Sequence, residues 1–121
     1  MAQSTPGKPA EPPAEWLRGT LDLLLLELLA EGPSYGYEIT QTVLARSAGY
    51  FAMKEGSLYP ALHRLERRRW VRPVWREVDG RRRKYYELTA AGRKAHEAKR
   101  RAWSQFSGKM ALLLGGADAP G

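Results

Sequence analysis

Hydrophobic residues recur at the three-to-four-residue spacing of an α-helix in four stretches of the chain, and two β-prone stretches lie between the third and the fourth. Gly32 and Pro33 should end the first helix, and Gly49 can give the second a left-handed C-terminal cap. Thr89 is a good N-cap for the fourth helix. The helices predicted on this basis, the first beginning at Trp16 or Leu17, cover residues 16–31, 35–47, 57–69 and 89–114.

The third predicted helix has an apolar side and a basic side. Three leucines recur at i, i+4 and i+7 from Leu58 and should face the core. Pro60 falls in the first turn whether the N-cap is Gly56 or Ser57, and amides there need no helical acceptor. The opposite side carries Tyr59, His63, Arg64, Arg67 and Arg68. Such a helix suits the major groove of DNA, although an ordinary surface helix can show the same pattern.

The two β-prone stretches, 70–78 and 81–88, should form a hairpin because Asp79-Gly80 suits a type I′ turn. A two-residue loop places Trp75 opposite Lys84, and Tyr86 lies on their side of the hairpin. The order of three helices, a hairpin and a last helix predicts a mainly α (α+β) fold. This fold is a winged helix-turn-helix with a two-stranded wing and a long C-terminal dimerisation helix.

Two helices carry more apolar surface than one small domain needs. Leucines on the first helix occupy two faces, and the far half of the last helix carries a heptad-like stripe. Packing within one chain and packing against a second copy both remain open. The residues expected at a dimer interface are Leu23, Leu26, Trp103, Phe106, Met110 and Leu113.

The net charge of +7 is concentrated in one segment. Residues 64–84 contain ten cations and three anions, which leaves +7, whereas the rest of the chain carries ten of each sign. A localised excess is typical of a surface that binds a polyanion. A solvated surface with no partner is the other interpretation of such a charge run.

Composition also narrows the classes of function. The chain has no cysteine, and its two histidines, His63 and His96, are not at metal-ligand spacing, so no metal site or cofactor is expected. The sequence shows neither the residues of a catalytic nucleophile nor a glycine-rich phosphate-binding loop, so we do not expect an enzyme. No apolar stretch is long enough to cross a membrane, and no signal peptide is apparent, so we expect a cytoplasmic protein. The expected organisation is a disordered tail at 1–15, a DNA-binding domain at 16–88, a dimerisation helix at 89–114 and a second tail at 115–121.

Three segments in series carry a family resemblance. "GTLDLLLLELLAEGPSYGYEI" (19–39), "EGSLYPALHRLERRRWV" (55–71) and "GRRRKYYELTAAG" (80–92) resemble the PadR-type transcriptional regulators, and the single helix after the wing resembles the family's small subfamily. The resemblance implies a bacterial repressor that binds a pseudo-palindromic double-stranded operator as a homodimer and is released by a small aromatic compound. Trp70 departs from the family, which commonly has a glycine or small residue there, and this puts the geometry of the wing in doubt.

The resemblance also implies roles for individual residues. The recognition helix is matched by Ser57, Tyr59, Pro60, His63 and Arg64, the start of the second helix by Tyr35 and Tyr37, and the wing by Arg81, Arg82, Arg83 and Lys84. We favour phosphate contacts for the wing cations and base-edge contacts for His63 and Arg64. Tyr59 either contacts a phosphate or packs under the wing. His96 is expected simply on the surface.

Trp103 has two interpretations. Two copies facing each other across a dimer would form an aromatic slot for a planar ligand, or Trp103 is a dimer-core residue without a ligand. Two alternatives to a specific DNA-binding regulator also remain. One is a winged helix that contacts an acidic protein partner or binds nucleic acid without specificity, and the other is a single-strand or RNA binder.

Overall fold

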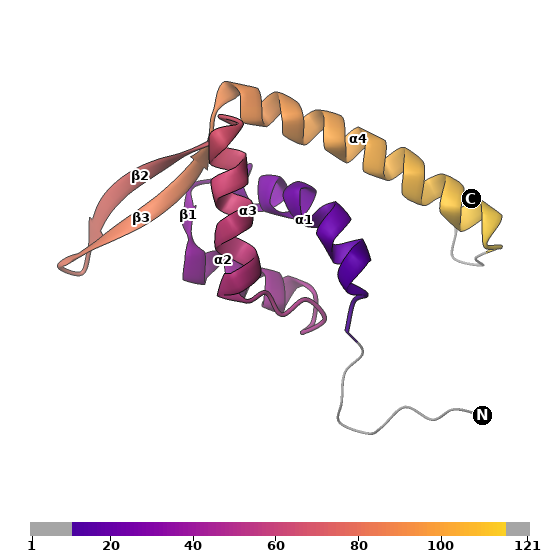
Figure 1. Ribbon diagram of the computed structural model, residues 1–121, viewed down its shortest axis with the longest axis horizontal. Helices are drawn as coiled ribbons and strands as arrows, with labels where there is room; N and C mark the ends of the chain where they lie inside the picture. Colours follow the sequence, from indigo (N-terminus) through magenta and orange to yellow (C-terminus); the bar gives the residue numbers. More distant parts are fainter. Residues whose placement is uncertain (1–10, 116–121) are drawn as a thin grey trace, which may run out of the picture.

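A computed structural model of the chain describes residues 11–115. Helices α1 to α3 form one body, the hairpin β2–β3 projects from it, and α4 runs away from the base of the hairpin in the other direction (Figure 1). The elements are α1 (Ala14–Leu29), β1 (Ser34–Tyr35), α2 (Gly36–Arg46), α3 (Glu55–Arg67), β2 (Val71–Val78), β3 (Arg81–Leu88) and α4 (Ala90–Leu113). The mainly α, winged-helix prediction is therefore confirmed.

The boundaries of the first helix correct one expectation. α1 begins at Ala14, so residues 14 and 15 belong to the helix and not to the predicted N-terminal tail. The rest of that tail up to residue 10, and the C-terminal tail from residue 116, lie outside the described residues.

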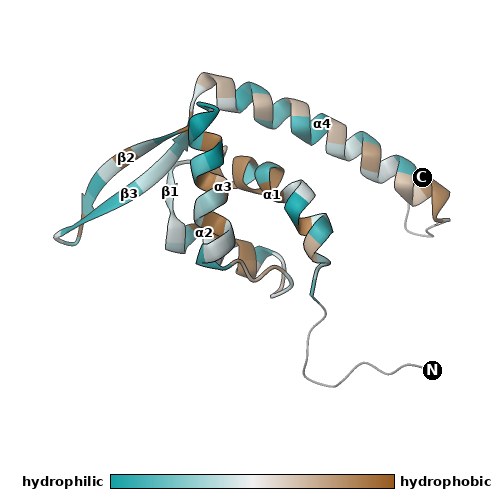
Figure 2. Ribbon diagram, viewed as in Figure 1, coloured by the Kyte–Doolittle hydropathy of each residue, from teal (hydrophilic) through white to brown (hydrophobic). Residues whose placement is uncertain are grey.

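The core lies where α1, α2 and α3 meet the inner face of the hairpin. Its completely buried side chains include Leu25 and Leu29 of α1, Leu62 of α3 and Tyr86 of β3. Burial of these apolar side chains, each worth about 1.5–3 kcal/mol, fixes the hairpin base against the helices. In Figure 2, hydrophobic and hydrophilic residues alternate along α1, α2 and α3, whereas the far part of the hairpin is mostly hydrophilic.

The hairpin has the predicted register. Trp75 pairs with Lys84, and the turn residues Asp79 and Gly80 have φ of 53° and 75°, as a type I′ turn requires. The sheet is larger than predicted, because β1 pairs with β3 and gives the strand order β1-β3-β2. A two-residue strand after Pro33 carries no periodicity, and this is why the sequence pattern did not reveal it.

Two helices end at a residue with left-handed backbone, a position that glycine usually occupies. Arg69 has φ of 61°, and the Trp70 amide donates to the Leu65 carbonyl at 3.0 Å, which is a Schellman motif with arginine at the left-handed position. At the end of α2 the same position is taken by Ala48, with φ of 53°, and the predicted cap Gly49 follows it. The left-handed position that favours glycine is thus Arg69. Trp70, the residue at which the sequence departs from the family, comes one residue later.

α3 starts two residues earlier than predicted, with Lys54 as the N-cap. Pro60 is therefore inside the helix, in its second turn, and the prediction that it lies in the first turn is wrong. The proline removes the amide that would donate to the Gly56 carbonyl. Gly56 is exposed, so water can reach this residue.

The start of α4 is tied to the end of α3. The Thr89 hydroxyl accepts from the Gly92 amide at 3.0 Å, as predicted for an N-cap, and donates to the Arg69 carbonyl at 2.6 Å. His96, expected merely on the surface, is only 12% exposed and lies 2.7 Å from the Glu27 carboxylate of α1. These contacts hold the first half of α4 against the body of the molecule.

Among residues 11–115, none of the helices combines the length and apolarity that crossing a membrane demands.

Candidate nucleic-acid interface

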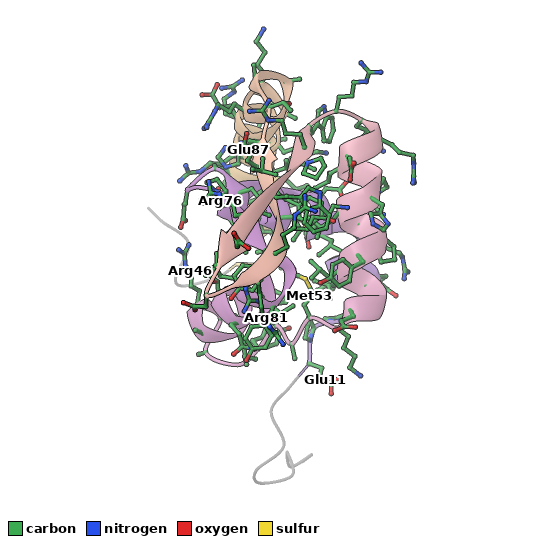
Figure 3. The ribbon with its side chains drawn as sticks, turned by 90° about the vertical axis from the view of Figure 1, so that its left-hand side faces the viewer. Glu11, Arg46, Met53, Arg76, Arg81 and Glu87 are labelled. Atoms are coloured by element: carbon green, nitrogen blue, oxygen red, sulfur yellow. The ribbon has the colours of Figure 1, made fainter. Side chains whose placement is uncertain are left out.

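An open groove of about 540 Å³ lies between α3 and β3. It is lined by His63, Glu66, Arg67, Arg69 and Lys84, so four of its five residues can carry a positive charge or donate hydrogen bonds. Figure 3 shows α3 standing beside the hairpin, with long side chains projecting from both. In this groove, cations from the basic segment 64–84 lie together on one surface.

The outward side of α3 is formed by residues at helical spacing. Ser57, Pro60, His63 and Arg67 are all exposed, whereas the leucines on the opposite side are buried. All five predicted recognition residues therefore lie on α3 with exposed or partly exposed side chains, but two of them, Tyr59 and Arg64, are directed away from the groove.

Arg64 is directed toward α1 and away from the groove. Its Nη2 donates to the Asp22 Oδ1 at 2.6 Å, and Arg68 reaches the other carboxylate oxygen at 3.4 Å. In this arrangement Arg64 pairs with α1 and does not line the groove, so its contact with base edges stays a prediction. The physical reason is the Asp22 carboxylate, which satisfies the guanidinium within the chain.

Tyr59 packs between the start of α2 and the sheet. It lies against the core, and Gly36 is buried beneath its ring. Burial raises the pKa of Tyr59 above its ordinary value, and the negative charge of Glu55 and the nearby Tyr86 raise it further. Of the two roles left open, packing is the one that the geometry supports.

Substitution of Gly36 by alanine is expected to lower the free energy of unfolding by about 1–2 kcal/mol. A Cβ atom there would lie 2.8 Å from Tyr59 Cζ and closer still to the hydroxyl, so the phenol must swing out into solvent. Chemical denaturation measures the loss. In the same variant, tyrosinate absorbance during a pH titration should show the pKa of Tyr59 falling back toward its ordinary value.

The matched control is Gly56→Ala. Gly56 also lies in the first turn of a helix, and a Cβ atom there would have no neighbour within 4 Å. It should leave stability unchanged or slightly raised, since alanine is the better helix former. Equal losses in both variants would show that Tyr59 is not held against Gly36.

The two sides of the wing differ in what they contact. Lys84 and Arg82 lie on the side that faces α3, where Lys84 reaches the groove and the Arg82 guanidinium lies 4.8 Å from the centre of the exposed Trp75 ring. Arg81 and Arg83 point to the other side because side chains alternate along a strand. The four predicted wing residues are therefore divided between two surfaces.

Arg83 is held by aromatic rings on the side away from α3. Its guanidinium lies 4.6 Å from the centre of the Tyr35 ring, and Tyr35 in turn packs edge-on against Tyr85 at 5.2 Å. The Arg83 Nε is buried without a hydrogen-bond partner among the described residues. Figure 3 shows Arg76 and Arg81 along the same hairpin. Tyr35 is thus a sheet residue, whereas Tyr37 is 66% exposed at the start of α2.

The residues predicted at a dimer interface fall into two groups. Trp103, Phe106, Met110 and Leu113 are exposed on the far half of α4, although they are large and apolar. Leu26 is 0% exposed because it packs in the core of its own chain, so it has no surface left for a second copy. That expectation is corrected. Leu23 is partly buried.

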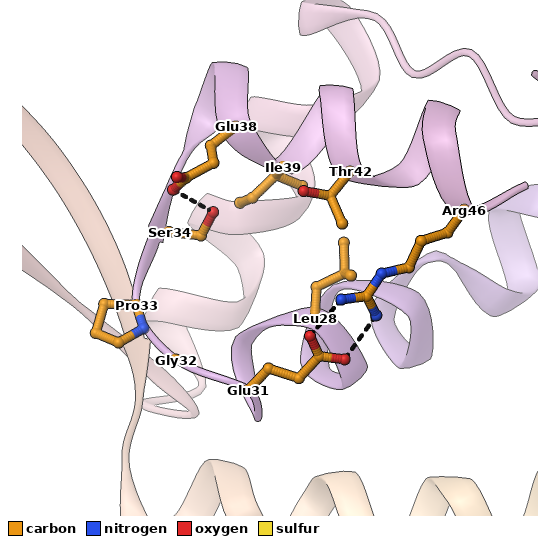
Figure 4. A pocket seen from close by; sticks show the side chains of 9 residues that line it. All are labelled: Leu28, Glu31, Gly32, Pro33, Ser34, Glu38, Ile39, Thr42 and Arg46. Carbon is orange, nitrogen blue, oxygen red and sulfur yellow. Dashed lines mark hydrogen bonds and ion pairs between the residues drawn. The ribbon is translucent and has the colours of Figure 1, made fainter.

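A second hollow, of about 170 Å³, lies between the end of α1 and α2 (Figure 4). Arg46 closes one side of it by pairing with Glu31, with Nη1 donating to Oε2 at 2.6 Å. These hydrogen bonds hold the pKa of Glu31 below its usual value. The site is small and charge-compensated, and it shares no lining residue with the groove.

Several residues of the interface were not in the predicted set. Arg67 follows His63 by one helical turn and was predicted on the same basic side of the helix, but it was not named among the recognition residues. Helical spacing could not reveal two other residues. Arg69 lines the groove from the left-handed position after α3, and Asp22 binds Arg64 from a different helix.

The elements define a winged-helix protein, with a recognition-type helix, a β-hairpin wing and a basic groove between them. Comparison with known proteins agrees: residues 25–98 match the transcriptional regulator PadR-like family. This chain belongs to that family, which is one of transcriptional regulators and not of enzymes.

Individual relatives cover most of both chains. Transcriptional regulator Rv3488 of Mycobacterium tuberculosis is 35% identical over 102 residues, which are 84% of this chain and 90% of that protein. A transcriptional regulator from Clostridium thermocellum is similar in structure, with a TM-score of 0.76 and 32% identity over 84% of this chain and 96% of the other. A PadR-like transcriptional regulator from Bacillus cereus has the same TM-score, with 27% identity over 84% and 98%.

Proposed function

We propose that this transcriptional regulator is a homodimeric repressor that binds a pseudo-palindromic double-stranded operator. The observation that carries the proposal is the basic groove between α3 and β3, because it joins a helix and a wing in the arrangement that reads DNA. In it, His63 and Arg67 would meet base edges in the major groove. Lys84 and Arg82 would meet the phosphates alongside.

The dimer part of the proposal rests on α4. Its far half leaves Trp103, Phe106, Met110 and Leu113 exposed, and apolar side chains at this spacing favour a partner helix. A second copy supplies one by a two-fold axis, and the same axis gives the operator its two half-sites, about 10 bp or somewhat more apart. Such a protein acts in the cytoplasm, at the nucleoid when bound.

Release by a small aromatic compound would use Trp103. The residue is 45% exposed, and the centre of its ring lies 6.1 Å from that of Phe106, so two copies would offer four aromatic rings around a planar molecule. A ligand that favours a dimer with wrongly spaced recognition helices lowers DNA affinity by the difference in its own affinity for the two states.

The test is binding to a labelled duplex that carries the DNA upstream of this protein's own gene, beside a scrambled duplex of equal length. Each is titrated at two salt concentrations. We expect a preference of about a hundredfold or more for the upstream duplex, within the range found for specific binding and retained at the higher salt. Equal binding to both duplexes that disappears with salt would favour a polyanion surface or an acidic protein partner instead.

A further inference from the structure

The Asp22 carboxylate of α1 contacts two arginines of α3. Its Oδ1 accepts from Arg64 at 2.6 Å and its Oδ2 from Arg68 at 3.4 Å. The Asp22 side chain is 18% exposed, whereas those of Arg64 and Arg68 are 38% and 49% exposed. One partly buried anion therefore holds two accessible guanidiniums, and the group keeps a net positive charge.

This carboxylate divides the cations of α3 into two sets. Arg64 and Arg68 are one turn apart on the flank beside α1, and the two helices pack against each other (Figure 1). His63 and Arg67, also one turn apart, lie in the groove beside the wing. All four lie on the recognition-type helix, but only the second pair is free of an acidic partner in this arrangement among residues 11–115.

We propose that Asp22 is a specificity-determining residue, which limits sequence-independent DNA affinity by occupying Arg64 and Arg68. A carboxylate and a phosphate bind a guanidinium through the same hydrogen bonds, so the two compete. Phosphate contacts add affinity for every sequence, whereas base contacts add it only for the operator. With two fewer phosphate contacts, the affinity for DNA of any sequence is lower. The ratio of operator affinity to affinity for other DNA is therefore larger. This inference rests on the proposed DNA-binding function.

The arrangement around Asp22 differs from that of an ion pair with a purely structural role. An ion pair that only joined two helices would be replaceable by apolar side chains of similar volume, with little loss of stability. It would also need no second arginine. The two half-exposed guanidiniums around one carboxylate are instead placed where they can turn to a different anion without unpacking the core.

The test is Asp22→Asn, measured as affinity for the scrambled duplex over a range of salt. We expect affinity to rise about tenfold or more at about 0.1 M salt, and the slope of log K against log salt to steepen by up to about 1.8, the value for two phosphates. The operator-to-scrambled ratio should fall. The triple variant Asp22→Asn, Arg64→Gln, Arg68→Gln should return the slope to that of the wild type.

Glu31→Gln is the matched control. It changes the net charge equally and also releases an arginine, but Arg46 lies at the hollow between α1 and α2 and not on the groove. The slope should not change in this variant. An equal increase in both variants would mean that net charge alone acts, and it would overturn the inference.

A second measurement holds even if Asp22→Asn does not fold. In the wild-type background, Arg64→Gln with Arg68→Gln should leave the slope for scrambled DNA unchanged, since Asp22 already occupies both side chains. A shallower slope would show that they contact phosphates despite Asp22, and the inference would fail while the proposed function stood. Absence of duplex binding by the wild type would overturn both.

Discussion

Glutamine at both Arg82 and Lys84 is expected to lower operator affinity by one to two orders of magnitude at about 0.1 M salt and to flatten the salt slope by about 1.8. These two side chains lie on the side of the wing that faces α3, and Lys84 lines the groove itself. Each cation that neutralises a phosphate releases counterions, so its loss appears in the slope as well as in the affinity. Fluorescence anisotropy of a labelled operator over a salt series measures both.

The opposite side of the same strand provides the control. Arg81→Gln with Arg83→Gln removes the same charge, but Arg83 is held against Tyr35 on the side away from α3. We expect a clearly smaller change in slope. If both double variants flatten the salt slope equally, the wing attracts DNA by its charge alone, and neither of its two sides makes more phosphate contacts than the other. Urea denaturation should accompany each variant, since Arg82 also packs on Trp75.

Gly92→Ala is expected to lower the free energy of unfolding by about 2–3 kcal/mol, more than Gly36→Ala. A Cβ atom at this position would lie 2.9 Å from the Trp70 carbonyl carbon and even closer to its oxygen. Here the obstacle is backbone, which also accepts a hydrogen bond from the Thr89 amide at 3.0 Å, so it cannot turn aside as the Tyr59 phenol can. Either α4 moves or the junction with α3 opens.

Gly108→Ala in the same helix is the control for this prediction. A Cβ atom there would have no neighbour within 4 Å, and the usual gain of about 0.5–1 kcal/mol for alanine over glycine in a helix is expected. Urea denaturation at one protein concentration compares the two variants. A neutral Gly92→Ala would mean that α4 docks less closely on Trp70 than the structure describes.

The hairpin and the order of the elements were predictable because their signals are local. Asp79-Gly80 fixes a turn by backbone sterics alone, and the pairing of Trp75 with Lys84 follows from it by counting. Thr89 identifies the start of α4 in the same way. A property that depends on neighbours in sequence can be predicted from one chain.

Contacts between distant segments could not be predicted from the sequence. Asp22 and Arg64 are 42 positions apart, so no pattern around Arg64 shows that its guanidinium is already bound. Leu26 was assigned to an interface because consecutive leucines make two faces of α1 equally apolar, and only the packing of α2 and α3 decides which face is inside. Arg69 and Ala48 adopt left-handed backbone that their side chains disfavour, at positions where the surrounding structure imposes the helix end.

The way α4 is attached has a mechanical consequence. The helix has 24 residues and is therefore about 36 Å long, yet its hydrogen bonds to the rest of the chain lie in its first third, at Thr89 and His96. Residues 97–113, about 25 Å of helix, therefore extend as an arm beyond the last of these contacts. A rotation of this arm by about 5° at His96 displaces its far end by about 2 Å. A force on the exposed aromatic end acts as a torque at His96 and on its contact with Glu27 of α1.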